Sequence, residues 1–168
     1  MIRAILAMDQ DWGIGKNGDL PWPRNPADLK WFKQTTTGST VVMGRKTWDS
    51  LPVKPLPNRR NIVISHDPSI IYKTPHPNFA CPLGAYRILL KDRVIAQRTK
   101  EEGVWIIGGA TLLTSCLDII DEIWISNIAG SYDCDVFLPK DTIMKDFTAS
   151  TNEATDDGLS ITIWRKNK

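Results

Sequence analysis

The chain has 168 residues, of which 42% are hydrophobic and 24% are charged, and its formal net charge is +2. This composition is that of a globular protein and excludes a disordered or low-complexity chain. The longest apolar runs fall well short of the roughly 20 residues that a membrane-spanning helix needs, and the apolar start ends at Asp9, too early for a signal peptide.

Short apolar, β-branched runs alternate with helical patterns along the chain. Strands are predicted, in order, at Ile2–Met8, Thr40–Met43, Asn61–Ser65, Val104–Ile107, Glu122–Ile128, Phe147–Thr151 and Leu159–Arg165. Helices are predicted at Pro26–Thr36, Lys46–Ser50, Gly84–Thr99 and Thr111–Cys116. This order predicts an α/β fold, a single domain over residues 1–168 with a mostly parallel central sheet and helices on both faces. A C-terminal antiparallel hairpin would turn at Asp156–Gly158.

Two long loops interrupt this alternation. Gly13–Pro23 has three glycines and two prolines and includes the large apolar residues Leu20 and Trp22. It therefore has the composition of a lid, although an ordinary surface loop fits equally well. Asp67–Pro82 has four prolines and is predicted to be a surface excursion.

The cysteines indicate the cellular compartment of the protein, and its charge distribution indicates which kinds of partner it can bind. Cys81, Cys116 and Cys134 are odd in number and widely spaced, which indicates reduced thiols in a cytoplasmic protein. The two histidines do not stand at ligand spacing from them, so no metal site is expected. Residues 1–60 hold 10 Lys and Arg against 5 Asp and Glu. This local excess suits small anions, and we expect neither a nucleic acid nor a membrane as a partner.

The predicted helix at Pro26–Thr36 carries one carboxylate on its apolar side. Asn25 suits the N-cap and Pro26 the first helical position. At 100° per residue, Asp28 lies between Trp31 and Phe32 and away from the lysines. A carboxylate there must be paired or must line a cavity, unless it only stabilises the positive end of the helix dipole.

Glycines at two strand ends suggest a place for phosphates. The strand at 40–43 runs into Gly44–Thr47, and the strand at 104–107 runs into Gly108–Thr111, each opening a helix. Helix N-termini bind anions, although tight packing is the better explanation of a single such turn. A third strand ends at Ser65-His66, where His66 could be an ordinary exposed histidine. Two glycine turns in one small domain favour a dinucleotide site at the carboxyl ends of the strands, without the usual Gly-x-Gly-x-x-Gly pattern.

Taken together, these segments resemble the dihydrofolate reductase family. They occur in the family's order from residue 1 to about residue 66 and again from about residue 104 to the end. The matching pieces are Ile14-Gly15 with Asp19–Trp22, Pro26–Leu29 with Trp31-Phe32, Val42–Trp48, Leu56–Ile62, Ile107–Gly109, and Asp135 with Leu138-Pro139. Each piece is modest, but their shared order is specific.

The resemblance implies transfer of a hydride from NADPH to C6 of 7,8-dihydrofolate and of a proton to N5. It implies a monomer whose partners are dihydrofolate and NADPH, and whose product feeds one-carbon metabolism. Asp28 would hydrogen-bond the pterin and tune its protonation, with water admitted by the lid as the proton donor. Leu20, Trp22 and Ser126 would complete the catalytic set.

The family's binding residues carry over position by position. Arg59 would take the glutamate α-carboxylate, which suits the fork geometry of its guanidinium. The remaining substrate contacts would come from Ile5, Leu29, Phe32, Leu51, Leu56 and Ile107, together with Asp28 and Ser126. The cofactor contacts would come from Ala7, Ile14, Gly15, Asp19, Leu20, Gly44, Arg45, Lys46, Thr47, Ser65, His66, Ile107, Gly108, Gly109, Ala110, Thr111 and Leu112. Gly108–Gly109 would form the family's cis peptide bond.

Three positions depart from the family pattern. Ser126 stands where the family usually has threonine, while Thr111 and Leu113 stand where it often has a basic residue and an aromatic one. Two other classes stay open from the residues. The first is a pyrimidine reductase of riboflavin synthesis, which would lack the helix carboxylate Asp28 and the Arg59 motif. The second is a folate- or nucleotide-binding protein that has lost turnover, against which the presence of Asp28, Arg59 and Gly108-Gly109 argues.

Overall fold

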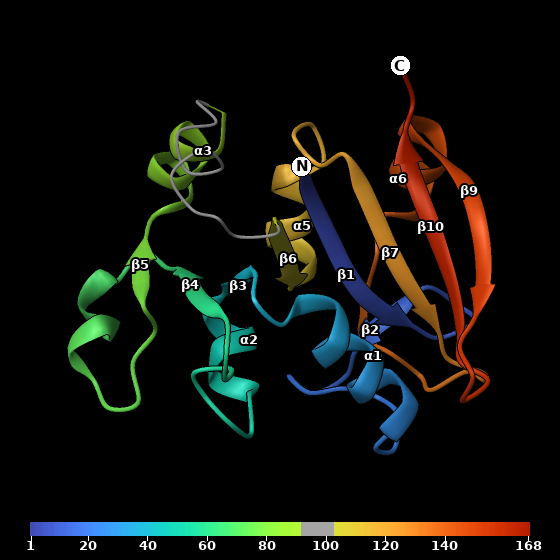
Figure 1. The fold of residues 1–168 in the computed structure, drawn as a ribbon, viewed down its shortest axis with the longest axis horizontal. Helices are drawn as coiled ribbons and strands as arrows, with labels where there is room; N and C mark the ends of the chain where they lie inside the picture. Colours follow the sequence, from blue (N-terminus) through green and yellow to red (C-terminus); the bar gives the residue numbers. More distant parts are fainter. Residues whose placement is uncertain (92–102) are drawn as a thin grey trace.

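A central sheet organises the molecule, which a computed structural model describes over residues 1–91 and 103–168 (Figure 1). From edge to edge its strands are β5 (Phe79–Cys81), β4 (Arg60–Ile64), β3 (Thr40–Gly44), β6 (Val104–Gly108), β1 (Ile2–Met8), β7 (Glu122–Asn127), β10 (Ser160–Lys166) and β9 (Phe147–Ala154). From β5 to β7 neighbouring strands are parallel, while β10 and β9 form an antiparallel hairpin. The predicted sheet with its C-terminal hairpin is confirmed.

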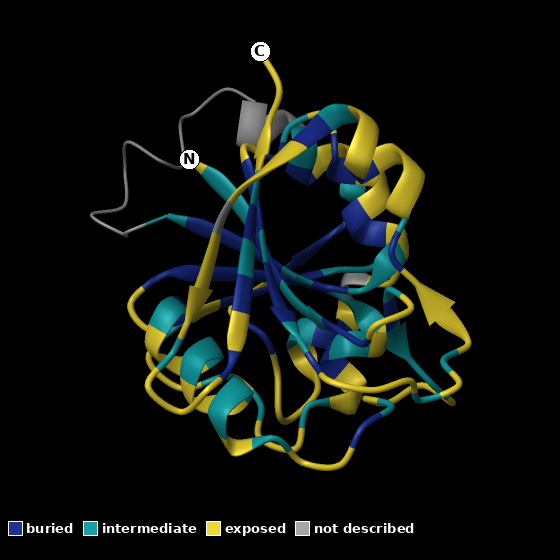
Figure 2. Cartoon of the chain, turned by 90° about the vertical axis from the view of Figure 1, so that its right-hand side faces the viewer, coloured by how far each residue is buried: buried dark blue, intermediate teal, exposed yellow. Residues whose placement is uncertain are grey.

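Helices cover both faces of this sheet, as predicted. They are α1 (Pro26–Thr36), α2 (Arg45–Ser50), α3 (Leu83–Lys91), α5 (Ala110–Cys116) and α6 (Lys140–Asp146). Side chains alternate along a strand, so Val42 packs with residues of α5 and α6, whereas Val41 and Met43 pack with α1 and α2. The buried strands lie between helices whose outer surfaces are exposed (Figure 2).

Local signals placed several elements correctly. The bounds of β1 and α1 match the prediction, and the Asn25 side chain caps α1 by accepting from Asp28 N at 3.1 Å. Gly158, with φ +78°, turns the hairpin, which Thr155 N closes on Leu159 O at 2.9 Å. The predicted helix at Gly84–Thr99 is found as α3 up to Lys91, and its remaining residues lie outside the described part of the chain.

The predicted surface excursion at Asp67–Pro82 is confirmed for its exposed residues, which include Tyr72 at 84%, but the segment also has secondary structure that was not predicted. This segment contains a 3-10 helix, η1 (Pro68–Tyr72), and the edge strand β5, which pairs in parallel with β4. Ile70 is 2% exposed, and Ala80 and Cys81 are also buried. The strand β5 was not predicted because it has only three residues in a proline-rich segment. Its burial depends on pairing with β4 and not on its own residue pattern.

The predicted loop at Gly13–Pro23 begins with a short strand. This strand, β2 (Gly13–Gly15), pairs antiparallel with β8 (Val136–Phe137) in a separate two-stranded sheet. Neither β8 nor the following α6 was predicted, because β8 has only two residues and α6 is a seven-residue helix with only two apolar residues. The pairing ties the first part of this loop to the segment after β7.

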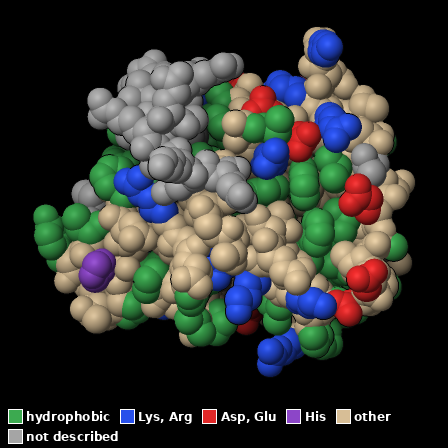
Figure 3. Space-filling view, viewed as in Figure 1, with side chains coloured by type: hydrophobic (Ala, Val, Ile, Leu, Met, Phe, Trp, Pro, Cys, Tyr) green, Lys and Arg blue, Asp and Glu red, His purple; other side chains and the backbone are tan. Residues whose placement is uncertain are grey.

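The three cysteine thiols are free. In the described ranges, none of the helices has the length and apolar character needed to cross a membrane. On the face shown in Figure 3, lysine and arginine side chains are interspersed with acidic ones rather than gathered in one block.

Candidate functional site

The carboxyl ends of the parallel strands bring the predicted site residues to one edge of the sheet. Gly44 at the end of β3 pairs with Ile64 at the end of β4, and Ala7 on β1 pairs with Ser126 on β7. Gly108 ends β6 between β3 and β1. Segments far apart in the sequence therefore meet where open α/β sheets bind ligands.

Asp28 lies in the first turn of α1 with its side chain half-buried. Burial raises the pKa of its carboxyl above the usual range, and the side chain of Ser126 opposes this shift by favouring the charged form. The carboxyl forms no ion pair with any residue in the described ranges. Because Asn25 supplies the helix cap, Asp28 is not needed for that task.

Ser126, on β7, is 1% exposed. Its Oγ is buried and forms no hydrogen bond of full geometry with the described residues, so the hydroxyl is free to turn toward the Asp28 carboxyl. A carboxylate that is half-buried and helped only by one hydroxyl is suited to bind a hydrogen-bond donor pair, such as an amino-pyrimidinone edge.

The residues predicted to contact the substrate rings are apolar, and two of them are exposed. Leu29 follows Asp28 on α1 and is 42% exposed, and Leu20 is 54% exposed. The other residues predicted to contact the substrate rings pack on one side of the sheet around buried Ile5: Phe32, Leu51, Leu56 and Ile107. This surface suits a flat heterocycle followed by an aromatic ring.

Arg59 lies beyond this apolar surface and is held on three sides. Its Nε donates to Pro57 O at 2.9 Å, and its Nη1 donates to Thr36 Oγ1 at 3.1 Å. The guanidinium carbon lies 5.7 Å from the centre of the Phe32 ring. Burial lowers the pKa of Arg59, yet it has no carboxylate partner in the described ranges. A half-buried, unpaired cation of this kind suits an anionic ligand.

Gly108, at the end of β6, is a position that favours glycine. Gly108 has φ +139°, and a Cβ added there would lie 3.2 Å from Thr47 Oγ1. The peptide bond between Gly108 and Gly109 is cis, which confirms the expectation from sequence. The start of α2 and the start of α5 thus approach each other closely, forming a cradle that a side chain would fill.

Polar groups flank this cradle. Arg45 donates from Nε to both oxygens of Asp49, at 3.1 and 3.2 Å, and Lys46 is exposed. Ser65 Oγ accepts from Asp67 N at 3.1 Å, and His66 is exposed beside it. Cations and hydroxyls at two neighbouring strand ends fit the phosphates of a nicotinamide dinucleotide.

The start of α5 contributes less than its sequence position suggested. Ala110 begins the helix and Thr111 is exposed, but Leu112 is 7% exposed and packs in the core. The Leu112 side chain is therefore a packing residue, and only its backbone remains for a ligand.

The Gly13–Pro23 segment is anchored by a residue whose part sequence reasoning missed. Asp135 accepts from Asn17 N at 2.9 Å through Oδ2 and donates from its own N to Gly15 O at 2.9 Å. Trp22, in contrast, is 6% exposed and packs edge-on to Tyr132 with ring centroids 6.1 Å apart. The segment therefore has a buried end at Trp22 and an exposed centre.

Asp9 anchors the root of the same segment. Its carboxylate is 1% exposed and accepts from Asp11 N and Gly13 N at 2.9 Å and from Tyr132 N at 3.1 Å. Cys134 Sγ approaches it at 3.3 Å and occupies the space that a side chain at Gly13 would need. The contacts with Asp11 N and Gly13 N are local, whereas those with Tyr132 N and Cys134 Sγ join residues 123 and 125 positions apart and are not marked by any sequence pattern.

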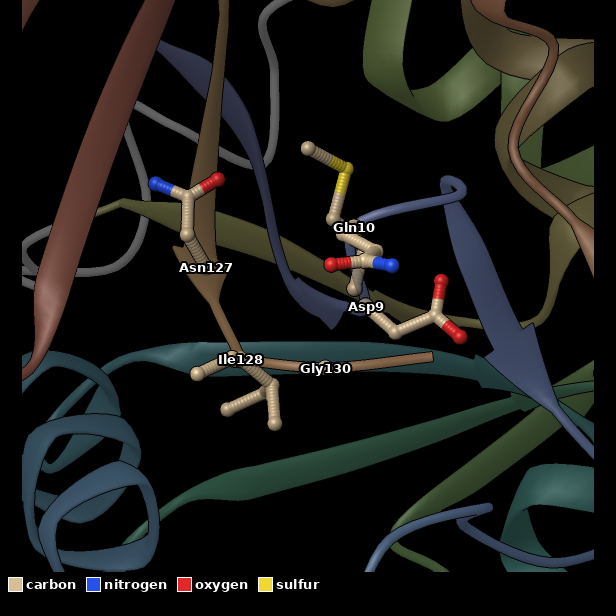
Figure 4. Close-up of a pocket in the computed structure, with 7 residues that line it drawn as sticks. Asp9, Gln10, Asn127, Ile128 and Gly130 are labelled. Atoms are coloured by element: carbon tan, nitrogen blue, oxygen red, sulfur yellow. The ribbon is translucent and has the colours of Figure 1, made fainter. Parts of the chain in front are cut away.

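Two cavities lie beside the expected site rather than in it. A hollow of about 470 Å³ is lined by Met8–Gln10 and Asn127–Gly130, just beyond Ala7 and Ser126 (Figure 4). The Asp9 carboxylate points away from Asn127 there. A smaller cavity of about 130 Å³ separates α1 from the hairpin turn. Neither cavity is lined by Asp28 or Arg59. The candidate site is therefore inferred from the positions and environments of these two side chains and not from a cavity.

Comparison with known proteins identifies the family. The dihydrofolate reductase family profile matches residues 1–163, which is nearly the whole chain. The chain belongs to the dihydrofolate reductase family. Membership makes it an oxidoreductase that reduces dihydrofolate to tetrahydrofolate with a nicotinamide cofactor, a reaction of one-carbon metabolism.

Individual dihydrofolate reductases agree with this assignment. The chain is 33% identical over 206 residues to dihydrofolate reductase of Cryptococcus neoformans, with 98% of this chain and 80% of the relative covered. It is 36% identical over 140 residues to that of Bacillus subtilis, covering 83% and 76%. The bifunctional dihydrofolate reductase-thymidylate synthase of Glycine max is 35% identical over 149 residues, covering 82% of this chain but only 28% of that longer protein.

Proposed function

We propose that the chain uses NADPH as its hydride donor and that Asp28 anchors the pterin of 7,8-dihydrofolate. The observation that carries this proposal is the half-buried Asp28 carboxyl, which has a raised pKa and faces Ser126 at the carboxyl edge of the sheet. Such a carboxylate binds the ring's N3 and 2-amino group as two donors and thereby selects a tautomer that accepts a proton at N5.

The side chains around Asp28 would orient the substrate. Ser126 supports the charged carboxylate, and the exposed Leu20 and Leu29 cover the ring faces with Phe32. Arg59 takes the glutamate α-carboxylate at the far end of the molecule. The segment containing Leu20 excludes bulk water while admitting the single water that protonates N5.

The cofactor would supply the hydride, and this chain would hold it in place. The preference for NADPH over NADH rests on Arg45, Lys46, Ser65 and His66, because an additional 2′-phosphate needs cationic and hydroxyl partners. Thr47, Gly108 and Gly109 form the cradle beside the nicotinamide half. We further propose that residues 1–168 act as one domain, as a cytoplasmic monomer without a nucleic-acid partner.

A comparison of the two reduced cofactors tests this proposal. With saturating dihydrofolate, kcat/KM should be at least about tenfold higher for NADPH than for NADH, which corresponds to roughly 1.4 kcal/mol. Replacing Arg45 with alanine should lower this ratio, because it should weaken the binding of NADPH and leave the binding of NADH unchanged. Equal use of both cofactors by the wild-type protein would contradict the proposed phosphate contacts, and reduction of a pyrimidine in place of dihydrofolate would indicate the related reductase class.

A further inference from the structure

Thr36 is the last residue of α1 and is fully buried, at 0% exposed. Its hydroxyl donates to Phe32 O at 2.7 Å, one helical turn earlier. The same oxygen accepts from Arg59 Nη1 at 3.1 Å. The hydroxyl proton is therefore committed to the helix backbone, and the lone pairs of Oγ1 are directed at the guanidinium.

We propose that Thr36 is a positioning residue that aims Arg59 at the carboxylate of the substrate. This inference rests on the proposed role of Arg59 as the residue that binds the glutamate α-carboxylate. Thr36 does not touch the substrate in this proposal; it acts by fixing the orientation of the guanidinium plane.

The hydrogen-bond inventory of Arg59 supports this role. Arginine has five N–H donors, and the contacts to Pro57 O and Thr36 Oγ1 use one at Nε and one at Nη1. These two contacts fix the guanidinium at Nε and at Nη1, and the guanidinium carbon lies 5.7 Å from the centre of the Phe32 ring. The two Nη2 donors and the second Nη1 donor form no hydrogen bond with the described residues, so three donors on the two terminal nitrogens remain for a carboxylate.

A purely structural role for Thr36 is the main alternative. A threonine that bonds back to the carbonyl four residues earlier occurs at helix ends without any ligand. The neighbouring Thr37 shows this arrangement alone, because its hydroxyl donates to Lys33 O at 2.6 Å, its side chain is exposed, and no hydrogen bond joins it to Arg59. Thr37 is thus a matched control for the backbone contact.

Substrates with and without the glutamate separate the two roles. The test compares dihydrofolate with 6-methyl-7,8-dihydropterin, which has the reacting ring but no carboxylate, in the wild type and in Thr36→Val, Thr36→Ser, Thr37→Val and Arg59→Ala. Valine keeps the shape of threonine and removes only the hydroxyl. Thr36→Val should raise the KM for dihydrofolate about five- to tenfold, which matches the loss of one hydrogen bond of ordinary net strength. Its kcat/KM for the small pterin should change by less than about twofold.

The other variants decide between the possible outcomes. Thr36→Ser should restore the KM for dihydrofolate, and Thr37→Val should resemble the wild type with both substrates. The inference is overturned if Thr36→Val behaves as Thr37→Val while Arg59→Ala still loses dihydrofolate selectively; the proposed role of Arg59 would then stand. Equal losses with both substrates in Arg59→Ala would overturn both. If Thr36→Val does not fold, as judged by circular dichroism, Thr36→Ala is measured with the same two substrates and the same criterion.

Discussion

The side chain of Ser126 on β7 opposes the burial that raises the pKa of the Asp28 carboxyl on α1. The two residues come from distant parts of the chain: Asp28 lies in the first turn of α1, and Ser126 lies on β7, the neighbour of β1 in the centre of the sheet. Burial and the hydroxyl thus act on one proton equilibrium in opposite directions. This balance sets the pH range in which Asp28 carries its charge.

Replacing Asp28 with asparagine should slow hydride transfer by about 100-fold or more at neutral pH, because a neutral amide neither pairs with two ring donors nor favours proton uptake at N5. Stopped-flow measurement of NADPH oxidation with dihydrofolate gives the rate. Circular dichroism should show an intact fold, since Asn25 continues to cap α1. Turnover close to that of the wild type would exclude the assigned role.

The same substitution should stabilise the ligand-free protein at neutral pH. Because the pKa of Asp28 is higher in the folded chain than in the unfolded one, its favourable contribution is present below the unfolded pKa and is lost as the pH rises through the folded pKa. Above that range the buried charge opposes folding, and asparagine removes it. Thermal melts should therefore give a higher Tm for Asp28→Asn than for the wild type at pH 7, with the difference shrinking under acid conditions. A lower Tm at pH 7 would show that a favourable partner of the carboxylate has been missed.

Ser126→Ala should raise the pKa of Asp28 further, because it removes the group that opposes burial. If the ionised carboxylate is the active form, the acid limb of the pH–rate profile moves to higher pH. Ser126→Thr keeps the hydroxyl and serves as the control, with little displacement expected. Superimposable profiles for alanine and wild type would mean that Ser126 has no electrostatic part in catalysis.

Asp9→Asn should destabilise the fold and do so most at neutral pH. Burial raises the pKa of Asp9, but the N–H groups of Gly13, Tyr132 and Asp11, with the Cys134 thiol, outweigh it and lower the pKa. The stability that this carboxylate adds is present above its unfolded pKa and is lost as the pH falls through its folded pKa. Urea unfolding at pH 7 should show a loss of about 1–3 kcal/mol, the range for weakened hydrogen bonds to a buried charged group. The loss should be smaller under strongly acid conditions, and a pH-independent loss would point to packing instead.

Local patterns were sufficient for the elements that carry their own signals. The helix at Pro26–Thr36 combines a cap, a first-turn proline and an apolar face, and its bounds were predicted correctly. The strand at Phe79–Cys81 has three residues among prolines, and its place at the sheet edge depends on pairing with β4. Pairing with a neighbouring strand decided the structure of this segment, and such pairing cannot be predicted from the segment alone.

In the candidate site, too, some features were predicted from the sequence and others depend on contacts between distant residues. Helix periodicity singled out Asp28, whereas Arg59 and the cis Gly108–Gly109 bond were implied by the family resemblance, and the cis bond is confirmed. The contact between Thr36 and Arg59 was not predicted, because a threonine in the last turn of a helix usually serves only the helix. Nor was the contact of Asp135 with the backbone of Asn17, which requires the pairing of β2 with β8. Positioning contacts of this type become visible only in three dimensions.

The central claim is that this chain transfers a hydride from NADPH to dihydrofolate beside Asp28. The most direct test is to follow NADPH absorbance with purified protein in the presence and absence of 7,8-dihydrofolate. We predict oxidation that depends on dihydrofolate and yields one tetrahydrofolate per NADPH consumed. NADPH that stays reduced in the presence of folded protein and dihydrofolate would contradict the account.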